Sequence, residues 1–270
     1  MPAKPSLYYR PRSLEEALRY LERPDTKPLA GGTNLIAEGF SGVVIDLQDI
    51  GIDQLGYGDG YLTIGAMTKL TDLSDFISAD DIGDSADLQK GPGSLLLDSI
   101  HRAGPNTYRN TATVGGVLAS RLPDSELLAS LMVLDAEVTL IVNDKQKMPV
   151  PEYLAASERP AGLIVELAIP RSGGRGAAER VARTPADYPI VSVTAFEPEG
   201  GDIRLAATGI DARPVRLDKS EEMLKSGSVI EEAAKAARDM ARHPGDFRGD
   251  AAYRAEMAYV LTKRVLDQIQ

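Results

Sequence analysis

The chain has 270 residues, 43% of them apolar, with a net charge of −10 and no cysteine. This length and apolar content fit a globular protein of one large domain or two smaller ones, and the acidic balance argues against nucleic acid as the main partner, because phosphate binding needs a basic surface. The lack of cysteine excludes disulfides, a thiolate nucleophile and a cysteine-held iron–sulfur cluster within this chain, so any redox chemistry must be carried by a bound organic cofactor.

Membrane and metal binding are also disfavoured. No apolar run approaches the roughly 18 residues of a membrane span. Residues 1–10 have no apolar stretch after their charged residue, so we expect no signal peptide and a cytoplasmic location. The two histidines, His101 and His243, are too few for a His-rich metal site, and neither lies in the recognisable context of a Ser–His–Asp triad.

The first part of the chain alternates predicted helices and strands. Residues 13–23 predict an amphipathic helix, with Ser13 as N-cap and Glu16 completing a capping box. The apolar run Val43–Ile45 predicts a buried strand. Residues 56–60, GYGDG, predict a hairpin turn and not a dinucleotide-binding fingerprint, because a strand follows them and no helix opens there.

The strand predicted at 61–64 precedes a helix that runs toward Phe76. Thr68 or Thr71 is the predicted N-cap of this helix. Residues 94–104 predict an apolar helix that stops at its final glycine.

Residues 106–116 predict a polar loop that leads into a double glycine. A helix of strong apolar periodicity follows at 124–136, and then a strand at 137–142. Another strand is predicted at 163–170. Residues 171–178, RSGGRGAA, predict a glycine-rich linker or flexible loop.

Composition changes after this linker, so we place a domain boundary near residue 172. Residues 191–210 predict two strands joined by the turn EPEGGD. Two amphipathic helices, at 228–243 and 251–269, finish the chain.

Two segments share a paired glycine between apolar residues and a polar stretch. They are Leu29–Ile36, LAGGTNLI, and Thr113–Ser120, TVGGVLAS. A Gly–Gly pair removes two side chains and permits positive φ, so successive N–H groups can point into one anion-binding hollow. Two such loops facing each other could hold a pyrophosphate from both sides. A single Gly–Gly is more often a plain turn, and neither segment is a P-loop, because no Lys-Ser or Lys-Thr follows at the required place.

With their flanks, these segments resemble the FAD-binding subunit of molybdenum hydroxylases. That family includes the medium subunit of carbon monoxide dehydrogenase and the flavin domain of xanthine dehydrogenase. The resemblance covers nearly the whole chain, and the stretches that carry it are LAGGTNLI, LTIGAMTKLTDL, YRNTATVGGVLASRLPDSELLASLMVLDAEV, RTPADYPIVSV, TGIDARPVRL and AAYRAEMAYVLTKRVL.

The resemblance implies an α+β fold. Residues 1–171 would form an FAD-binding domain of the vanillyl-alcohol-oxidase/p-cresol-methylhydroxylase type, with two lobes at about 1–54 and 55–171. Residues 172–270 would form a smaller domain, a three-stranded antiparallel sheet with helices. This division agrees with the boundary expected from composition.

The resemblance also assigns cofactor contacts by position. Ser120 and Glu126 would approach the ribityl or adenosine portion of FAD, and Asp187 and Tyr188 would reach toward the flavin ring. The alternative for Asp187 and Tyr188 is a plain turn before a strand. The residues expected to line the pyrophosphate are Ala30, Gly31, Gly32, Thr33, Asn34, Leu35, Thr113, Val114, Gly115 and Gly116. The change Gly32→Val or Gly116→Val should then exclude FAD and leave the fold largely intact.

The chain departs from the family pattern at four positions. Val117 stands where the family usually has Asn, which removes an amide contact worth roughly 0.5–1.5 kcal/mol. Arg121 and Leu122 replace the usual Ala-Ser, and Glu126 replaces Asp. We expect Arg121 either to pair with a phosphate or to face solvent. FAD should be bound non-covalently, since the chain has no cysteine and neither glycine segment has a histidine.

The resemblance implies an electron-transfer role in a larger complex. Substrate would be oxidised at a molybdenum cofactor on a large subunit, and electrons would pass through two [2Fe–2S] clusters on a small subunit to FAD. The flavin would then reduce NAD⁺, a quinone, a carrier protein or oxygen, and the chain needs no catalytic acid or base. Two alternatives remain open: a stand-alone FAD-dependent oxidoreductase, and a scaffold that kept the fold and lost FAD.

Overall fold

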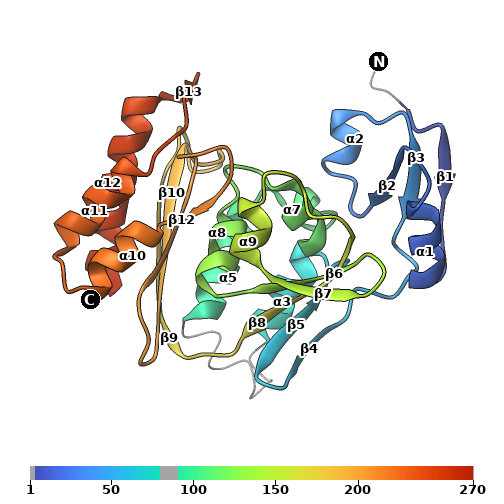
Figure 1. The fold of residues 1–270 in the computed structure, drawn as a ribbon, viewed down its shortest axis with the longest axis horizontal. Coiled ribbons are helices and arrows are strands. Elements are labelled where there is room, and N and C mark those ends of the chain that lie inside the picture. Colours follow the sequence, from blue (N-terminus) through green and yellow to red (C-terminus); the bar gives the residue numbers. More distant parts are fainter. Residues whose placement is uncertain (1–3, 80–90, 270) are drawn as a thin grey trace.

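The computed structural model describes residues 4–79 and 91–269. Three regions follow one another along the molecule, each built around its own sheet: an N-terminal lobe (4–54), a middle lobe (55–171) and a C-terminal domain (172–269) (Figure 1). The N-terminal lobe and the C-terminal domain lie at opposite ends, and the middle lobe lies between them.

The N-terminal lobe has a parallel sheet in the order β1-β3-β2. Its helix α1 begins as the sequence predicts, because Ser13 Oγ accepts a hydrogen bond from Glu16 N at 3.2 Å. The returning bond differs from the expected capping box, since Glu16 accepts from the N–H of Arg12. The elements are β1 (Leu7–Tyr9), α1 (Leu14–Leu21), β2 (Thr26–Leu29), α2 (Leu35–Glu38) and β3 (Val43–Asp46).

The middle lobe has a five-stranded antiparallel sheet in the order β4-β5-β8-β6-β7. The predicted hairpin turn is confirmed: Asp59 and Gly60 both have positive φ, of 51° and 81°, as a two-residue hairpin loop requires. The strands are β4 (Leu55–Gly58), β5 (Tyr61–Gly65), β6 (Glu137–Ile141), β7 (Lys145–Pro149) and β8 (Leu163–Pro170). The helices are α3 (Leu70–Ser78), α5 (Pro92–Arg102), α6 (Asn106–Arg109), α7 (Val114–Ser120), α8 (Glu126–Val133) and α9 (Val150–Ala155).

The predicted cap of α3 is wrong. Lys69 is the N-cap residue and makes no side-chain cap bond, while Thr68 and Thr71 donate elsewhere, to Asp53 O and Asn110 Oδ1. The reason is tertiary: Leu70 N donates to Ala112 O at 3.0 Å, so a neighbouring backbone segment satisfies the start of the helix.

The C-terminal domain has an antiparallel sheet in the order β12-β11-β10-β9, with the two-residue β12 beyond the three strands expected. Its strands are β9 (Gly174–Val181), β10 (Val191–Pro198), β11 (Arg204–Thr208) and β12 (Val215–Arg216), followed by a short hairpin of β13 (Gly245–Asp246) and β14 (Gly249–Asp250). Helices α10 (Asp218–Lys225), α11 (Ile230–Asp239) and α12 (Ala251–Ile269) complete it.

Two predictions in this domain need correction. Most of the expected glycine-rich linker belongs to β9, which pairs with β10 along its whole length. A Cβ on Gly174 would lie 2.4 Å from Glu197 O, so this glycine permits close strand approach and does not mark a flexible loop. Helix α10 was missed because its sequence DKSEEMLK is mostly charged, with Ser220 its one buried side chain.

The C-terminal domain contacts the middle lobe through apolar packing and through ion pairs and hydrogen bonds. Phe196 and Ala206 of its sheet are fully buried within the core of the middle lobe. Five arginines of the domain reach carboxylates or carbonyls of the middle lobe; we call this set the arginine junction: Arg180, Arg204, Arg213, Arg216 and Arg248. Arg204 and Arg216 both pair with Asp135 and donate to the carbonyls that end α8.

None of the helices within residues 4–79 and 91–269 has the length and apolar character needed to cross a membrane.

Candidate functional site

A crevice of about 200 Å³ lies between the N-terminal lobe and the middle lobe. Both glycine segments line it. Its further walls come from β2, the start of β8 and the segment after α9. The predicted residues that line it are Ala30, Gly31, Gly32, Thr33, Asn34, Leu35, Thr113, Gly115, Gly116 and Ser120.

The first glycine segment presents free backbone donors. Strand β2 ends at Leu29, the chain turns through Gly32 with φ of 70°, and α2 begins at Leu35. Within the described residues, the N–H groups of residues 32–35 donate to no protein acceptor. Four successive unbonded N–H groups on such a turn are suited to holding an anion.

The second glycine segment works differently from the expected loop. Gly115 and Gly116 lie in the first turn of α7, and protein acceptors already engage the N–H groups there. Val114 N donates to Thr68 O, Gly115 N to Ala66 O, both at 2.9 Å, and Gly116 N to the capping Thr113 Oγ1 at 3.1 Å. This segment therefore supplies a wall of the crevice, and the free donors come from the first segment.

The four glycines serve different purposes. A Cβ on Gly31 would lie 1.9 Å from Thr111 O, and one on Gly115 would lie 2.7 Å from Ala66 Cβ, so both allow parts of the protein to approach each other. Gly32 needs its positive φ, and a substitution there would strain the turn itself. A Cβ on Gly116 would meet only Thr113 Oγ1, at 2.9 Å, and Ala30 Cβ, at 3.7 Å, so this position faces the crevice.

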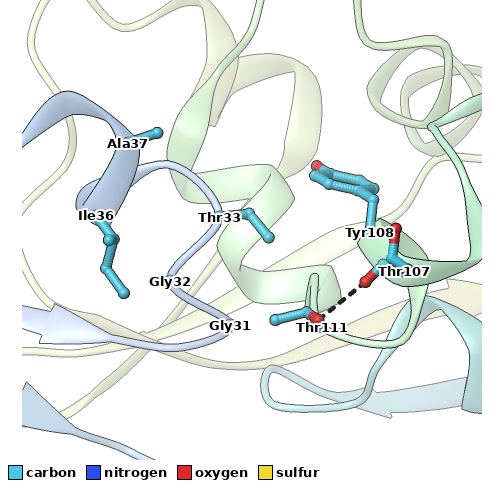
Figure 2. Close-up of a pocket in the computed structure, with 8 residues that line it drawn as sticks. All are labelled: Gly31, Gly32, Thr33, Ile36, Ala37, Thr107, Tyr108 and Thr111. Atoms are coloured by element: carbon cyan, nitrogen blue, oxygen red, sulfur yellow. Dashed lines mark hydrogen bonds between the residues drawn. The ribbon is translucent and has the colours of Figure 1, made fainter.

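A second, more open hollow of about 460 Å³ adjoins the same turn (Figure 2). Gly31, Gly32 and Thr33 line both hollows, so the free N–H groups lie where the two meet. The Thr33 side chain and the Tyr108 ring flank the open hollow in Figure 2, one from each lobe. A long ligand could therefore pass the turn and extend into both hollows.

Tyr108 is a candidate site residue that sequence reasoning missed. It lines the open hollow and also a small pocket of about 20 Å³ behind it. Burial, and then the neighbouring Tyr188, raise the pKa of the Tyr108 phenol, and a hydrogen bond with Thr33 partly offsets the rise. The available signal was an aromatic residue a few positions before the second glycine pair.

The small pocket brings together Glu126 and Tyr188 from different regions of the chain. Glu126 is 7% exposed and forms ion pairs with Arg180 at 3.2 Å and Arg102 at 3.5 Å. Burial raises the pKa of the Glu126 carboxyl, and the charges of the two arginines offset only part of this rise. Tyr188 is 48% exposed, so its ring forms one rim of the pocket.

The remaining predicted residues, Ser120, Val114 and Asp187, do not lie together in one hollow. Ser120 lines the crevice and Glu126 lines the small pocket, so the two do not share a hollow. Val114 is buried in the core of the middle lobe. Asp187 lines none of the three hollows described above, and its carbonyl accepts a bond from Arg180.

The expectation that Arg121 faces solvent is wrong, and its guanidinium is engaged away from the glycine segments. Arg121 is 8% exposed and ends α7 with φ of 52°, and its guanidinium donates to Leu154 O at 2.6 Å and to Ala156 O. It bonds carbonyls at the C-terminal end of α9, away from both solvent and the glycine turn. The other three departures from the family pattern, Val117, Leu122 and Glu126, all line the small pocket.

The far end of the crevice has two further residues that the sequence did not single out. The Tyr153 ring is 1% exposed and forms part of the wall. Arg159 lies on the same wall with an exposed side chain. Within residues 4–79 and 91–269, no three His, Asp or Glu side chains gather in a way that could hold a metal ion.

Comparison with known proteins agrees with this architecture. Residues 3–172 match the family described as FAD binding domain in molybdopterin dehydrogenase, and residues 179–269 match the CO dehydrogenase flavoprotein C-terminal domain. The chain therefore belongs to the FAD-binding domain family of the molybdopterin dehydrogenases. Its relatives are medium subunits of dehydrogenases and hydroxylases, and it is an FAD-dependent oxidoreductase of that class.

Individual relatives align with the chain along nearly its whole length. The chain is 26% identical to the glyceraldehyde dehydrogenase medium chain of Sulfolobus acidocaldarius, with 97% of each chain covered. It is 27% identical to the carbon monoxide dehydrogenase medium chain of Hydrogenophaga pseudoflava, covering 96% of this chain and 95% of that one. The solved carbon monoxide dehydrogenase of Hydrogenophaga pseudoflava has the same fold, with a TM-score of 0.87 at 24% identity, covering 100% of this chain and 98% of that chain.

Proposed function

We propose that this chain is the FAD-binding electron-transfer subunit of a molybdenum hydroxylase complex. The pyrophosphate of FAD would bind at the turn of residues 32–35, the adenosine half in the crevice, and the flavin half in the open hollow beside Tyr108. The observation that carries this placement is the run of four free N–H groups where the two hollows meet. A dinucleotide needs room on both sides of its pyrophosphate, and the turn offers it.

The side chains of the site would bind and orient FAD, and none of them is needed to transfer a proton. The N–H groups of the turn would neutralise the pyrophosphate, and Gly116 leaves its face open for close approach. Tyr108, across the open hollow from Thr33, and the half-exposed Tyr188 would limit water at the flavin end. When bound, FAD supplies a redox centre that accepts and releases electrons.

FAD would be held non-covalently. The chain has no cysteine, and its two histidines are engaged away from the hollows. His101 lies against Ser74 Oγ at 3.3 Å, and His243 Nδ1 accepts from Gly245 N at 2.9 Å. Neither lines the crevice, the open hollow or the small pocket.

The partners follow from the class of protein. Relatives are named medium chains, which fits a complex with a large and a small subunit. Because this chain has no cysteine, [2Fe–2S] clusters would lie on the small subunit, and the molybdenum cofactor on the large one. Electrons would pass from the clusters to FAD and on to NAD⁺, a quinone, a carrier protein or oxygen, in the cytoplasm. We also propose 1–171 and 172–270 as its two domains.

The change Gly116→Val tests the site. Its side chain would occupy the crevice, and such overpacking costs on the order of 1–3 kcal/mol, so the Kd for FAD should rise about five- to 150-fold. The apo protein should lose no more than about 0.5–2 kcal/mol of stability, the cost of disturbing the Thr113 cap that the added Cβ would crowd, and should still fold. Titration with FAD and denaturation without FAD measure the two quantities separately.

The matched control is Gly56→Val, at a strand position with no atom within 4 Å of an added Cβ. This variant should bind FAD as wild type does. A Gly116→Val protein that keeps wild-type affinity for FAD would contradict the placement of the cofactor.

A further inference from the structure

The small pocket has two walls that come from different domains. One wall is the segment after α7, with Asp124 and Glu126; the other is the Tyr188 ring of the C-terminal domain. Burial and the charge of Asp124 raise the pKa of the Tyr188 phenol, in keeping with the closeness of the two walls. The distance between these two walls determines how closely Asp124, Glu126 and the Tyr188 ring would surround the flavin end of the proposed site.

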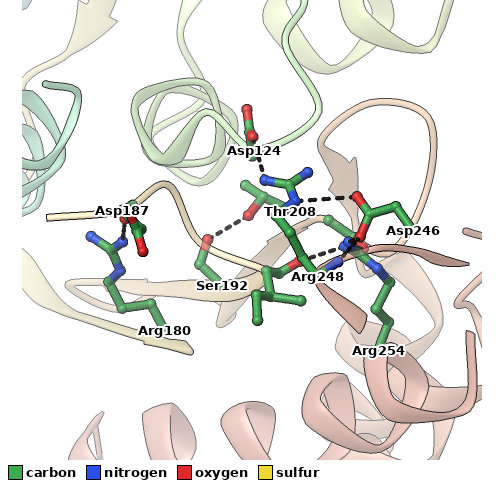
Figure 3. A network of polar contacts seen from close by, with 10 residues as sticks. Asp124, Arg180, Asp187, Ser192, Thr208, Asp246, Arg248 and Arg254 are labelled. Carbon is green, nitrogen blue, oxygen red and sulfur yellow. Dashed lines mark hydrogen bonds and ion pairs between the residues drawn. The ribbon is translucent and has the colours of Figure 1, made fainter. Parts of the chain in front are cut away.

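Arg248 ties the first wall to the C-terminal domain. Figure 3 shows its side chain between Asp124 and Asp246. Nη1 donates to Asp124 Oδ2 at 3.0 Å and Nε to Asp246 Oδ2 at 3.1 Å. The Arg248 side chain is 22% exposed and that of Asp124 is 17% exposed, so the pair is partly withdrawn from solvent.

Arg254 ties the second wall to the same carboxylate. Its Nη2 donates to Asp246 Oδ1 at 2.6 Å, and its Nη1 donates to Ile190 O at 2.6 Å, two residues after Tyr188. The Arg254 side chain is fully buried, so the end of the Tyr188 loop is held from inside the domain. Asp246 thus lies between two arginines, one bonded to each wall.

We propose that Arg248 is a positioning residue that fixes the spacing between Asp124 and Tyr188 and thereby the surroundings of the flavin ring. This inference rests on the proposed function, because it needs FAD in the adjoining hollow. Arg248 touches neither hollow and acts through the two walls. A purely structural ion pair would change stability and leave the bound flavin as it was.

The test is Arg248→Met in the full chain, reconstituted with FAD. A phenol close to a flavin quenches its emission, so loosening the Tyr188 wall should make the bound flavin more fluorescent and shift its midpoint potential. The Kd for FAD should rise less than about fivefold, because Arg248 does not touch FAD and a partly exposed ion pair contributes little. Arg248→Lys can reach only one of the two carboxylates, so its emission should lie between those of Arg248→Met and wild type.

Two further variants complete the experiment. Lys225→Met removes one positive charge from an exposed pair with Asp202 and should leave emission and potential at wild-type values. Asp124→Asn removes the charge at the other end of the bridge and should reproduce the effect of Arg248→Met, which keeps the test decisive if Arg248→Met folds poorly.

The outcomes separate the two proposals. Wild-type emission and potential in both Arg248→Met and Asp124→Asn would overturn the positioning role alone, whatever happens to stability. A wild-type chain that takes up no FAD would overturn the proposed function, and this inference with it. Brighter flavin in both variants, with the Lys225→Met control unchanged, would support it.

Discussion

The two junctions of the middle lobe are built on opposite plans. The C-terminal domain packs on the middle lobe through the fully buried Phe196. The arginine junction adds ion pairs and hydrogen bonds to carboxylates and carbonyls in and beside α8 and α9. The N-terminal lobe shares a small apolar cluster with the middle lobe, but within the described residues no ion pair crosses between them, and a crevice separates their glycine segments.

This difference indicates which junction a ligand completes. A junction with buried apolar contacts and paired charges is stable without help, whereas free N–H groups beside a crevice gain most from a bound anion. We therefore infer that the C-terminal domain is a fixed part of the fold and that FAD joins the N-terminal lobe to the rest. Three experiments test this difference between the two junctions.

The largest effect is expected for Phe196→Ala. Removing a fully buried aromatic side chain costs about 3–5 kcal/mol, and because Phe196 belongs to the middle-lobe core, the protein should still unfold in one cooperative step. Urea denaturation followed by circular dichroism and by tyrosine fluorescence measures this. Phe247→Ala, at a side chain 87% exposed, should stay within about 0.5 kcal/mol of wild type. Separate unfolding of the C-terminal domain would contradict the inference that this domain is a fixed part of the fold.

A smaller, pH-dependent effect is expected for Asp246→Asn. Burial favours a higher pKa for Asp246, but hydrogen bonds from Arg248 and Arg254 outweigh it and hold the pKa well below its usual value. A depressed carboxyl pKa contributes stability above the unfolded pKa of about 4, and this contribution is lost as the pH falls below that value.

Asp246→Asn should therefore cost about 1–3 kcal/mol at pH 7, and the difference from wild type should narrow as the pH is lowered from 4 to 3. Denaturation at several pH values provides the measurement. If the difference in unfolding free energy stayed constant or grew toward acid pH, the stabilisation of the Asp246 carboxylate by Arg248 and Arg254 would be contradicted.

The sequence predicted what local chemistry controls. Ser13 caps α1 and the Asp59–Gly60 turn forms the hairpin, because capping and turn preferences act over a few residues. The family resemblance reached further than periodicity did, since it covered both domains.

What the sequence did not reveal depends on contacts between distant residues. Thr68 and Thr71 do not cap α3, because the backbone of Ala112 already satisfies the helix start. The glycines near 174 form a strand, because β10 is available to pair with them. Arg121 is buried on carbonyls 33 residues or more away in the chain, which no local pattern could indicate.

The second glycine pair shows the same limit within the site. Both pairs looked alike in sequence, but Gly115 and Gly116 open a helix whose donors are already used by Ala66, Thr68 and Thr113. Only the first pair leaves its N–H groups free, and only the folded structure distinguishes the two. Tyr108 was missed because its position beside Tyr188 arises from a contact between domains.

The most direct test of this account is amide hydrogen exchange with and without FAD. At about 100 times the Kd, FAD can stabilise the protein by about 2.7 kcal/mol. We expect the slowed exchange to fall in residues 30–36 and in the turn before α7, whereas α8 and β11 at the arginine junction should exchange as in the apo protein. Gly116→Val at the same FAD concentration should show weaker protection, because that concentration is a smaller multiple of its raised Kd. Protection confined to the C-terminal junction, with residues 30–36 unchanged, would contradict the account.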